Sequence, residues 1–229
     1  GKDLLYLTTE NRLVYNQSIN DNHKLLLSGI FQTSDQTTST YSSRSANTAS
    51  SGITSPIAGS TTAKGGSGKT INRDMGLTLN GQYIFKEKYM FNAGYRWEAS
   101  SAMDASGRWG GFPTFGVAWH LGDEEFIQRL GFISLIKLRY SWGQSGNAPT
   151  GTSPYIGKFS AVTPGYGDMS AVKPESPDLT HLKYETITSN NIGVDVGLFS
   201  DRITFAVELY TKVTDDMLQK KIKVPSSTG

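Results

Sequence analysis

Alternation of apolar and polar side chains, sustained over segments of about ten residues, most constrains what this chain can fold into. The clearest case is Ile203–Val213. Its odd positions except Thr211 are apolar and its even positions are mostly polar: Ile203, Phe205, Val207, Leu209 and Val213 against Thr204, Ala206, Glu208, Tyr210 and Lys212. A β-strand sends successive side chains to opposite faces, so the segment is predicted to be a strand with one apolar and one polar face.

The same period recurs along the chain and predicts about eight strands. The later ones cover Met75–Phe85, Tyr89–Trp97, Phe115–Leu121, Ile136–Trp142, Ile192–Leu198 and Ile203–Val213, whereas the earlier Leu4–Gln17 and Lys24–Thr33 alternate less regularly. Strands of globular proteins average about 5–6 residues, and strands that cross a membrane need about 9–11. The predicted fold class is therefore all-β, an antiparallel transmembrane β-barrel segment.

The connections between these strands differ in length in a regular way. Short turns at 20–23, 86–88 and 200–201 alternate with longer connections at 100–110 and 122–134 and with two long loops at about 34–69 and 146–181. Asp123–Leu130 is predicted to form a short helix within one of them. Outer-membrane barrels have short periplasmic turns and longer extracellular loops, so the two long loops are predicted to be extracellular.

One stretch suggests a different chemistry, because Thr62–Thr70 reads TAKGGSGKT and ends like a phosphate-binding loop. The strict pattern requires glycine where Ala63 stands, and it requires a buried strand before the loop and a helix after it. The preceding residues, Ser51–Thr62, are rich in serine, threonine and glycine, and Ile71 begins a strand pattern. We therefore interpret the stretch as part of a polar loop that matches the motif by chance.

Nothing else in the sequence supports catalysis, a metal or a cofactor. The histidines His23, His120 and His181 lie far apart, and Asp123–Glu125 are best read as a solvated turn at a helix start. The chain of 229 residues has no cysteine and a net charge of only +2, which gives no strong attraction to nucleic acid. We expect a protein that is not an enzyme and binds no nucleic acid.

Aromatic residues gather at the predicted strand ends. Tyr83, Phe85 and Tyr89 flank one short turn and Phe199 another, while Trp97, Trp109 and Trp142 lie near the opposite ends. Membrane barrels carry aromatic belts at both interfaces because such rings have an apolar body and a polar edge. The aromatics thus favour a membrane barrel over the core of a β-sandwich.

Three segments carry a more specific resemblance. They read GRWGGFPTFGVAWHLGDEEFI (107–127), LIKLRYSWGQSGN (135–147) and YETITSNNIGVDVGLFSDRITFAVELYTKVTDDML (184–218). Together with the preceding strand pair, they resemble the barrel region of the SusC/RagA family, which are TonB-dependent transporters in the outer membrane of Bacteroidota. The resemblance covers roughly Ile71–Gly229. It departs from the family at Tyr184, where members usually carry tryptophan, and at Thr180–His181, which looks like a small insertion.

The resemblance implies that residues 1–229 are part of one barrel domain of the large type with about 22 strands, without its plug domain and remaining strands. It implies import of glycans or oligopeptides across the outer membrane of a Gram-negative bacterium, with a SusD-like surface lipoprotein as a lid and TonB acting through the plug. The long loops would face lid or substrate. Trp109, Tyr155 and Tyr166 are the candidate contacts, although packing within the loops is the better explanation for each of them taken singly.

Two alternatives remain open from the residues alone. A complete eight-stranded barrel could act as an adhesin or small pore, because about eight strands can close around a side-chain-filled interior. A soluble carbohydrate-binding sandwich would place the same apolar stripes in a dry core between two sheets. The location of the apolar faces discriminates the sandwich from a membrane barrel.

Overall fold

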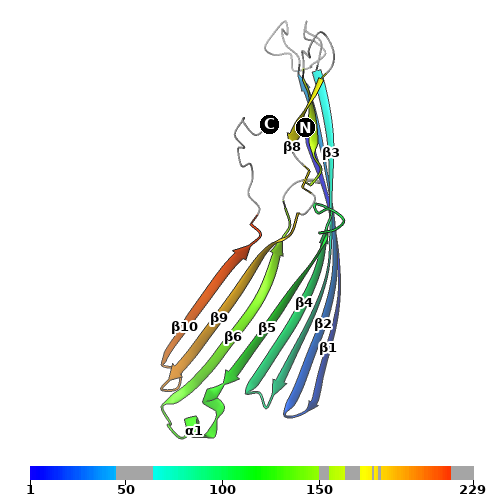
Figure 1. The fold of residues 1–229 in the computed structure, drawn as a ribbon. Helices are drawn as coiled ribbons and strands as arrows, with labels where there is room; N and C mark the ends of the chain where they lie inside the picture. The colour runs from blue at the N-terminus through cyan, green and yellow to red at the C-terminus, as the bar shows by residue number, and fades with distance from the viewer. Residues whose placement is uncertain (45–63, 150–154, 163–170, 177, 180–181, 218–229) are drawn as a thin grey trace, which may run out of the picture.

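The computed structural model describes residues 1–44, 64–149, 155–162, 171–176, 178–179 and 182–217. Its main element is one antiparallel sheet of eight strands in the order β1-β2-β3-β4-β5-β6-β9-β10 (Figure 1). The strands are β1 (Lys2–Asn20), β2 (His23–Arg44), β3 (Lys64–Phe85), β4 (Tyr89–Ser100), β5 (Trp109–His120), β6 (Ile133–Asn147), β9 (Glu185–Leu198) and β10 (Ile203–Asp215). The prediction of an all-β wall of about eight strands is confirmed.

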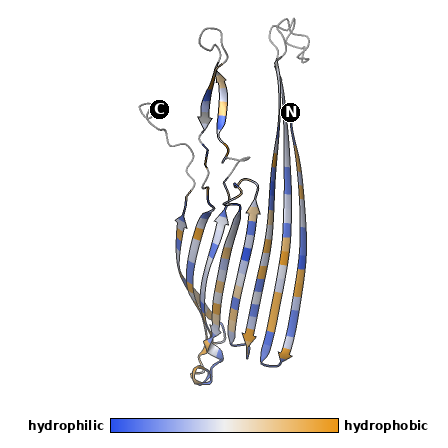
Figure 2. Ribbon diagram, turned by 45° about the vertical axis from the view of Figure 1, so that its right-hand side comes forward, coloured by the Kyte–Doolittle hydropathy of each residue, from blue (hydrophilic) through white to orange (hydrophobic). Residues whose placement is uncertain are grey.

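Strand register joins the apolar stripes into one continuous face. Leu77 pairs with Phe31 and with Trp97, and further along the sheet Val194 pairs with both Leu138 and Val207. Directly paired residues share a face, so the apolar set of each strand continues that of its neighbour. We call this the outer face, and the opposite face the inner face; Figure 2 shows the resulting alternation of hydrophobic and hydrophilic residues along the strands.

The short connections all lie at one end of the sheet, at the bottom of Figure 1. The β3–β4 turn places Lys86 and Glu87 at φ values of 51° and 57°, the left-handed conformation that matches the twist of a tight hairpin. The β5–β6 connection contains the 3₁₀-helix η2 (Leu121–Asp123) and the helix α1 (Glu125–Gln128), as predicted for Asp123–Leu130. In the part of the chain that the structure describes, no helix is long and apolar enough to cross a bilayer.

The bounds of the long connections differ from expectation. Strands β2 and β3 remain paired up to Arg44 and Lys64, so paired strand occupies both ends of the segment predicted as the loop 34–69. Residues 64–70 of the motif-like stretch lie in β3, and Lys69 pairs with Ser39, a setting that excludes the loop-to-helix geometry of a phosphate site. Between β6 and β9, a hairpin of β7 (Lys158–Val162) and β8 (Ala171–Ser176) interrupts the predicted loop 146–181.

The sheet is an open wall. Strands β1 and β10 form its two edges, which contradicts a closed barrel made by these eight strands alone. The other sheet among the described residues is the β7–β8 hairpin, so the outer face has no second layer against it, as a sandwich would require. Buried hydrophobic residues are accordingly few in the described parts, and they gather at the end with long connections: Ala99, Ala102, Met103, Phe112 and Tyr184.

Candidate functional site

Polar and small side chains line the inner face. It carries the pairs that alternate with the outer stripe along the strands: Thr78 with Arg96, Gln82 with Asn92, Gly116 with Ser141, and Lys137 with Asp195. Such a surface suits contact with water or with polar ligands and provides no apolar core. The inner face is therefore the candidate functional surface of this chain.

An ion-pair network connects three strands of this wall. Arg139 of β6 donates from Nε and Nη2 to the two carboxylate oxygens of Asp195 in β9, at 2.8 and 2.9 Å. Its Nη1 lies 3.7 Å from Glu208 of β10, which also accepts a 2.6 Å hydrogen bond from Asn191. Bidentate arginine–carboxylate pairs fix orientation as well as charge. The network thus fixes positively and negatively charged side chains at defined positions on the polar inner face.

Two glycines of the sheet leave space for the side chains of Arg139 and Arg96 to lie against the backbone. A Cβ added at Gly193 would come within 3.0 Å of Arg139 Nη2, and one at Gly76 within 3.2 Å of Arg96 Nη2. Arg96 in turn donates to Glu98 at 2.8 Å and to Thr78 at 3.3 Å. Glycine at these two positions leaves room for a guanidinium against the backbone, so both arginines reach their partners along the wall.

An aromatic cluster covers the end of the inner wall that carries the long connections. Met103, Phe112 and Tyr184 are buried together, and the rings of Phe112 and Tyr184 meet edge to face with centroids 5.7 Å apart. The Tyr184 hydroxyl donates to the Arg108 carbonyl at 3.0 Å. Burial raises the pKa of Tyr184 to about 12. The hydroxyl therefore remains protonated at neutral pH and ties the segment before β9 to the β4–β5 connection.

The three predicted contact residues lie in different settings. Trp109 begins β5, is 63% exposed, and pairs with Ala99 in the register of the outer face, which fits an aromatic belt better than a contact inside the channel. Tyr155 precedes β7, and its carbonyl accepts a hydrogen bond from the Leu179 amide at 3.0 Å. Tyr166 lies outside the described residues. A role of these residues in substrate or lid contact stays a prediction.

Sequence reasoning overlooked Phe112 and Met103. Phe112 pairs with Arg96, so it stands at an inner-face position where the alternation predicts a polar residue. That break in the pattern was the available signal, because an apolar ring on a polar face requires a partner. Met103 lies in a connection without periodicity, and only the folding of that connection over the wall buries it.

Aromatic rings form a row at the short-turn end of the outer face, as predicted for Tyr83, Phe85 and Tyr89. Neighbouring rings are stacked or tilted along the row, with Tyr83 beside Phe91 and Tyr89 beside Trp119 at 6.4 and 6.0 Å. Near the other end, Tyr95 and Trp97 lie 4.3 Å apart. Rings at both borders of an apolar band are typical of a membrane barrel.

Glu124 anchors this aromatic row from the β5–β6 connection, contrary to its interpretation as a merely solvated acid. It accepts hydrogen bonds from the Tyr89 hydroxyl at 2.7 Å and the Trp119 indole at 3.2 Å, and Lys88 lies 3.3 Å away. The bond from Tyr89, followed by that from Trp119, lowers the pKa of Glu124 below its ordinary value of 4.5. The anchor is therefore charged at neutral pH.

This lowered pKa predicts a specific pH response. A depressed carboxylate pKa means that the contribution to stability is present above the ordinary glutamate pKa and is lost as the pH falls through the folded-state pKa. In a variant that keeps only Trp119 among the tryptophans, we expect constant fluorescence from pH 7 down to about 5 and a change only below the ordinary glutamate range. Glu124→Gln should remove this transition, and its persistence in that variant would show that another group titrates.

Known proteins resemble this chain in sequence and in structure. Residues 3–229 match the family model described as TonB dependent receptor-like, beta-barrel. The chain belongs to the TonB-dependent receptor family. Barrels of this family are outer-membrane proteins, and the family consists of receptors and transporters rather than enzymes.

Two relatives illustrate how this receptor chain compares with longer proteins. It is 33% identical over 149 residues to TonB-dependent receptor P39 of Formosa agariphila, covering 64% of the chain and 14% of the relative. It is 31% identical over 159 residues to TonB-dependent receptor SusC of Bacteroides thetaiotaomicron, covering 64% of the chain and 15% of the relative. The chain thus spans about a seventh of the length of these receptors.

Solved structures show the same receptor fold. The structure of the RagAB peptide transporter superposes with a TM-score of 0.88 at 18% identity, covering 99% of this chain and 25% of the solved chain. The RagAB peptide importer in the 'open-open' state gives a TM-score of 0.83 at 18% identity. The eight-stranded sheet is therefore a wall segment of a larger receptor barrel.

Proposed function

We propose that this chain is part of the wall of an importer that carries glycans or oligopeptides across the outer membrane of a Gram-negative bacterium. The carrying observation is the two-faced sheet, whose apolar outer face is continuous over eight strands while its inner face is polar and ion-paired. Such a wall separates lipid from an aqueous interior, which is what a plugged transport barrel requires.

The proposed partners follow from the relatives. A SusD-like surface lipoprotein would cover the end with long connections, and TonB would act on a plug held inside the barrel. The names SusC and RagAB peptide transporter support this proposal without distinguishing sugar from peptide. In the proposed barrel, the charged inner wall between Arg96 and Glu208 offers paired donors and acceptors that either polar ligand can use.

Uptake by living cells tests this function. Cells that produce the complete receptor, and cells that lack its gene, would be incubated with fluorescent pools of oligopeptides and of oligosaccharides. We expect receptor-dependent uptake of one pool that stops when TonB is deleted or when a protonophore collapses the proton gradient. Uptake that continues without TonB would contradict energised import, and uptake of neither pool would contradict the substrate classes.

A further inference from the structure

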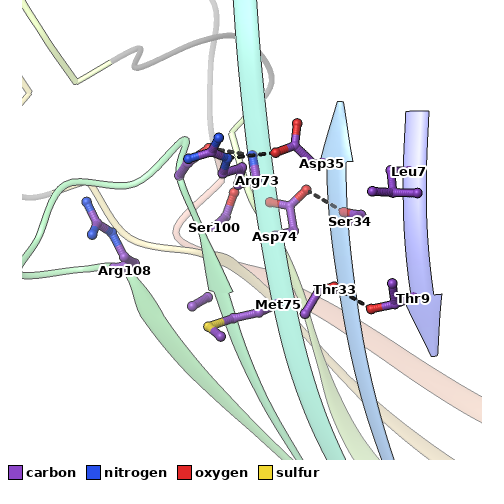
Figure 3. A pocket seen from close by; sticks show the side chains of 12 residues that line it. Leu7, Thr9, Thr33, Ser34, Asp35, Arg73, Asp74, Met75, Ser100 and Arg108 are labelled. Carbon is purple, nitrogen blue, oxygen red and sulfur yellow. Dashed lines mark hydrogen bonds and ion pairs between the residues drawn. The ribbon is translucent and has the colours of Figure 1, made fainter. Parts of the chain in front are cut away.

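Strand β3 continues well beyond the end of β4, past the level of Arg73 and Ser100 in Figure 3. Its pairing with β4 ends where Asp74 meets Ser100, whereas its pairing with β2 continues as far as Lys64. Residues 65–72 of β3 therefore have a neighbouring strand on the β2 side, and among the described residues no strand pairs with them on the other side. We call that unpaired side of residues 65–72 the free edge; it lies at the end with long connections.

Backbone N–H and C=O groups of alternate residues point toward the free edge. Just before it, the Arg73 amide donates to the Ser101 hydroxyl at 2.8 Å, and the Arg73 carbonyl accepts from the Ser101 amide at 2.8 Å. Both backbone groups of Arg73 thus face away from β2, and the register of β3 with β2 has no bulge beyond this residue. Because the backbone groups of an antiparallel strand alternate between its two sides, the same orientation recurs at every second residue. These residues are Ile71, Lys69, Ser67 and Gly65.

The intervening residues point the other way, toward β2. The Thr40 hydroxyl donates to the Gly68 carbonyl at 3.3 Å, and the Ser42 hydroxyl donates to the Gly66 carbonyl at 3.4 Å. These contacts place the even-numbered carbonyls on the β2 side, as the period of two requires. The free edge therefore presents one N–H and one C=O group from each odd-numbered residue, and no described backbone group pairs with them.

Most of the features that keep sheet edges from pairing are missing from the free edge. Proteins protect exposed edges with proline, β-bulges and charged side chains, because an unpaired row of N–H and C=O groups accepts another strand. Residues 65–72 read GGSGKTIN, without proline or bulge and with Lys69 as the one charged residue. The glycines carry no side chains, so an incoming strand finds room on both faces beside them.

We propose that the free edge binds an extended oligopeptide, which adds to β3 as a further strand in line with β4. In strand addition, main-chain hydrogen bonds supply affinity, and pockets for alternate side chains supply selectivity. The free edge offers the hydrogen bonds, but its glycines have no side chains with which to form such pockets. An edge of this kind suits peptides of varied sequence better than one fixed segment of a partner protein.

This inference rests on the proposed import function and selects one of its two substrate classes. A strand presents N–H and C=O groups to its neighbour at every second residue, a separation of roughly 6.6 Å. A glycan has hydroxyl groups but no such repeating pair of amide donor and carbonyl acceptor. The free edge therefore recognises a peptide backbone, and a peptide of about eight residues covers residues 65–72.

Proline substitution on the free edge tests the proposal. The complete receptor would be purified in mild detergent and titrated into a fluorescein-labelled peptide of eight alternating threonine and valine residues, with fluorescence anisotropy as the readout. Ser67→Pro combined with Lys69→Pro removes two outward N–H groups and leaves the hydrogen bonds to β2, because proline is tolerated on an edge strand where the N–H faces outward. We expect the peptide to bind at least about tenfold more weakly to this double variant.

The matched control changes the same two side chains and keeps both backbone donors. Ser67→Ala combined with Lys69→Ala should bind the peptide as the unaltered receptor does. N-methylated peptides add a second test, because a methyl group on an amide removes its hydrogen-bond donor. A peptide methylated on alternate amides keeps one intact edge and should still bind, whereas a peptide methylated on every amide should not bind.

Three outcomes would overturn the proposal. Equal affinity of the proline double variant would show that the peptide binds elsewhere on the receptor. Weaker binding by the alanine control would show that side chains and not the backbone edge recognise the peptide. Loss of a co-purifying surface protein from the proline variant, with unchanged peptide affinity, would show that a partner protein covers the edge. These binding measurements require neither TonB nor uptake, so their failure is distinct from failure of the import function.

Discussion

Replacing Val194 with arginine is expected to lower the free energy of unfolding of the complete barrel in lipid vesicles by roughly 2–4 kcal/mol. Val194 lies within the apolar stripe Ile192–Leu198 of β9 on the outer face, where it pairs with Leu138 and Val207. A guanidinium there would face acyl chains near the middle of the bilayer, where no water is available to solvate it. Urea titration with tryptophan fluorescence measures the change.

Arginine at two control positions tests whether the loss in free energy of unfolding depends on the face of the sheet and on the depth in the bilayer. Leu198→Arg, at the short-turn end of the same strand, should cost only about 0–1 kcal/mol because the side chain reaches the interface. Ser141→Arg lies on the inner face beside a 300 Å³ hollow and should also be nearly neutral. If Ser141→Arg destabilises the barrel as much as Val194→Arg, the outer face does not contact lipid.

Truncating Phe112 to alanine is expected to open the aromatic cluster while the barrel stays folded. Removal of a fully buried phenylalanine side chain lowers the free energy of unfolding by roughly 3–5 kcal/mol. Phe112 is only 5% exposed and packs against Met103 and Tyr184. Because this cluster joins connections to the wall and does not hold the strands together, the cost should appear as local opening. Limited proteolysis should cleave residues 101–108 about a hundredfold faster.

The control for this truncation is a phenylalanine outside any cluster. Phe159 in the β7–β8 hairpin is 71% exposed, so Phe159→Ala should leave the cleavage rate of residues 101–108 unchanged. Tyr184→Phe should have a smaller effect than Phe112→Ala, because it removes only the hydrogen bond to the Arg108 carbonyl. Wild-type cleavage kinetics in Phe112→Ala would show that the cluster does not secure the connection.

The sheet could be predicted from the sequence because one short-range rule defines it. The period of two in segments such as Met75–Phe85 assigns each side chain to a face, and the tight turns at 86–88 and 200–201 fix which strands pair. Short turns also determine the end of the sheet at which the aromatic row of Tyr83 and Tyr89 must lie. The local sequence pattern was therefore sufficient to predict the eight-stranded sheet.

The parts that could not be predicted depend on contacts between distant residues. Strands β2 and β3 extend through polar residues such as Thr38–Thr40, which carry no apolar stripe, because each supplies hydrogen-bond partners to the other. The role of Glu124 requires Tyr89 and Trp119 to meet it across a turn. Likewise, the pairing of Arg139 with Asp195 becomes apparent only when the register of β6 and β9 is known.

Site-directed spin labelling along β4 tests the central claim most directly, and the absence of cysteine from the sequence makes single-cysteine labelling of this segment straightforward. Each residue from Tyr89 to Trp97 of the complete barrel in lipid vesicles would be labelled in turn. The wall described above predicts high collision rates with oxygen at odd positions such as Phe91 and with a water-soluble nickel chelate at even positions such as Asn92. Equal exposure of both sets to the nickel chelate, or protection of the odd positions from both reagents, would contradict a lipid-facing outer surface.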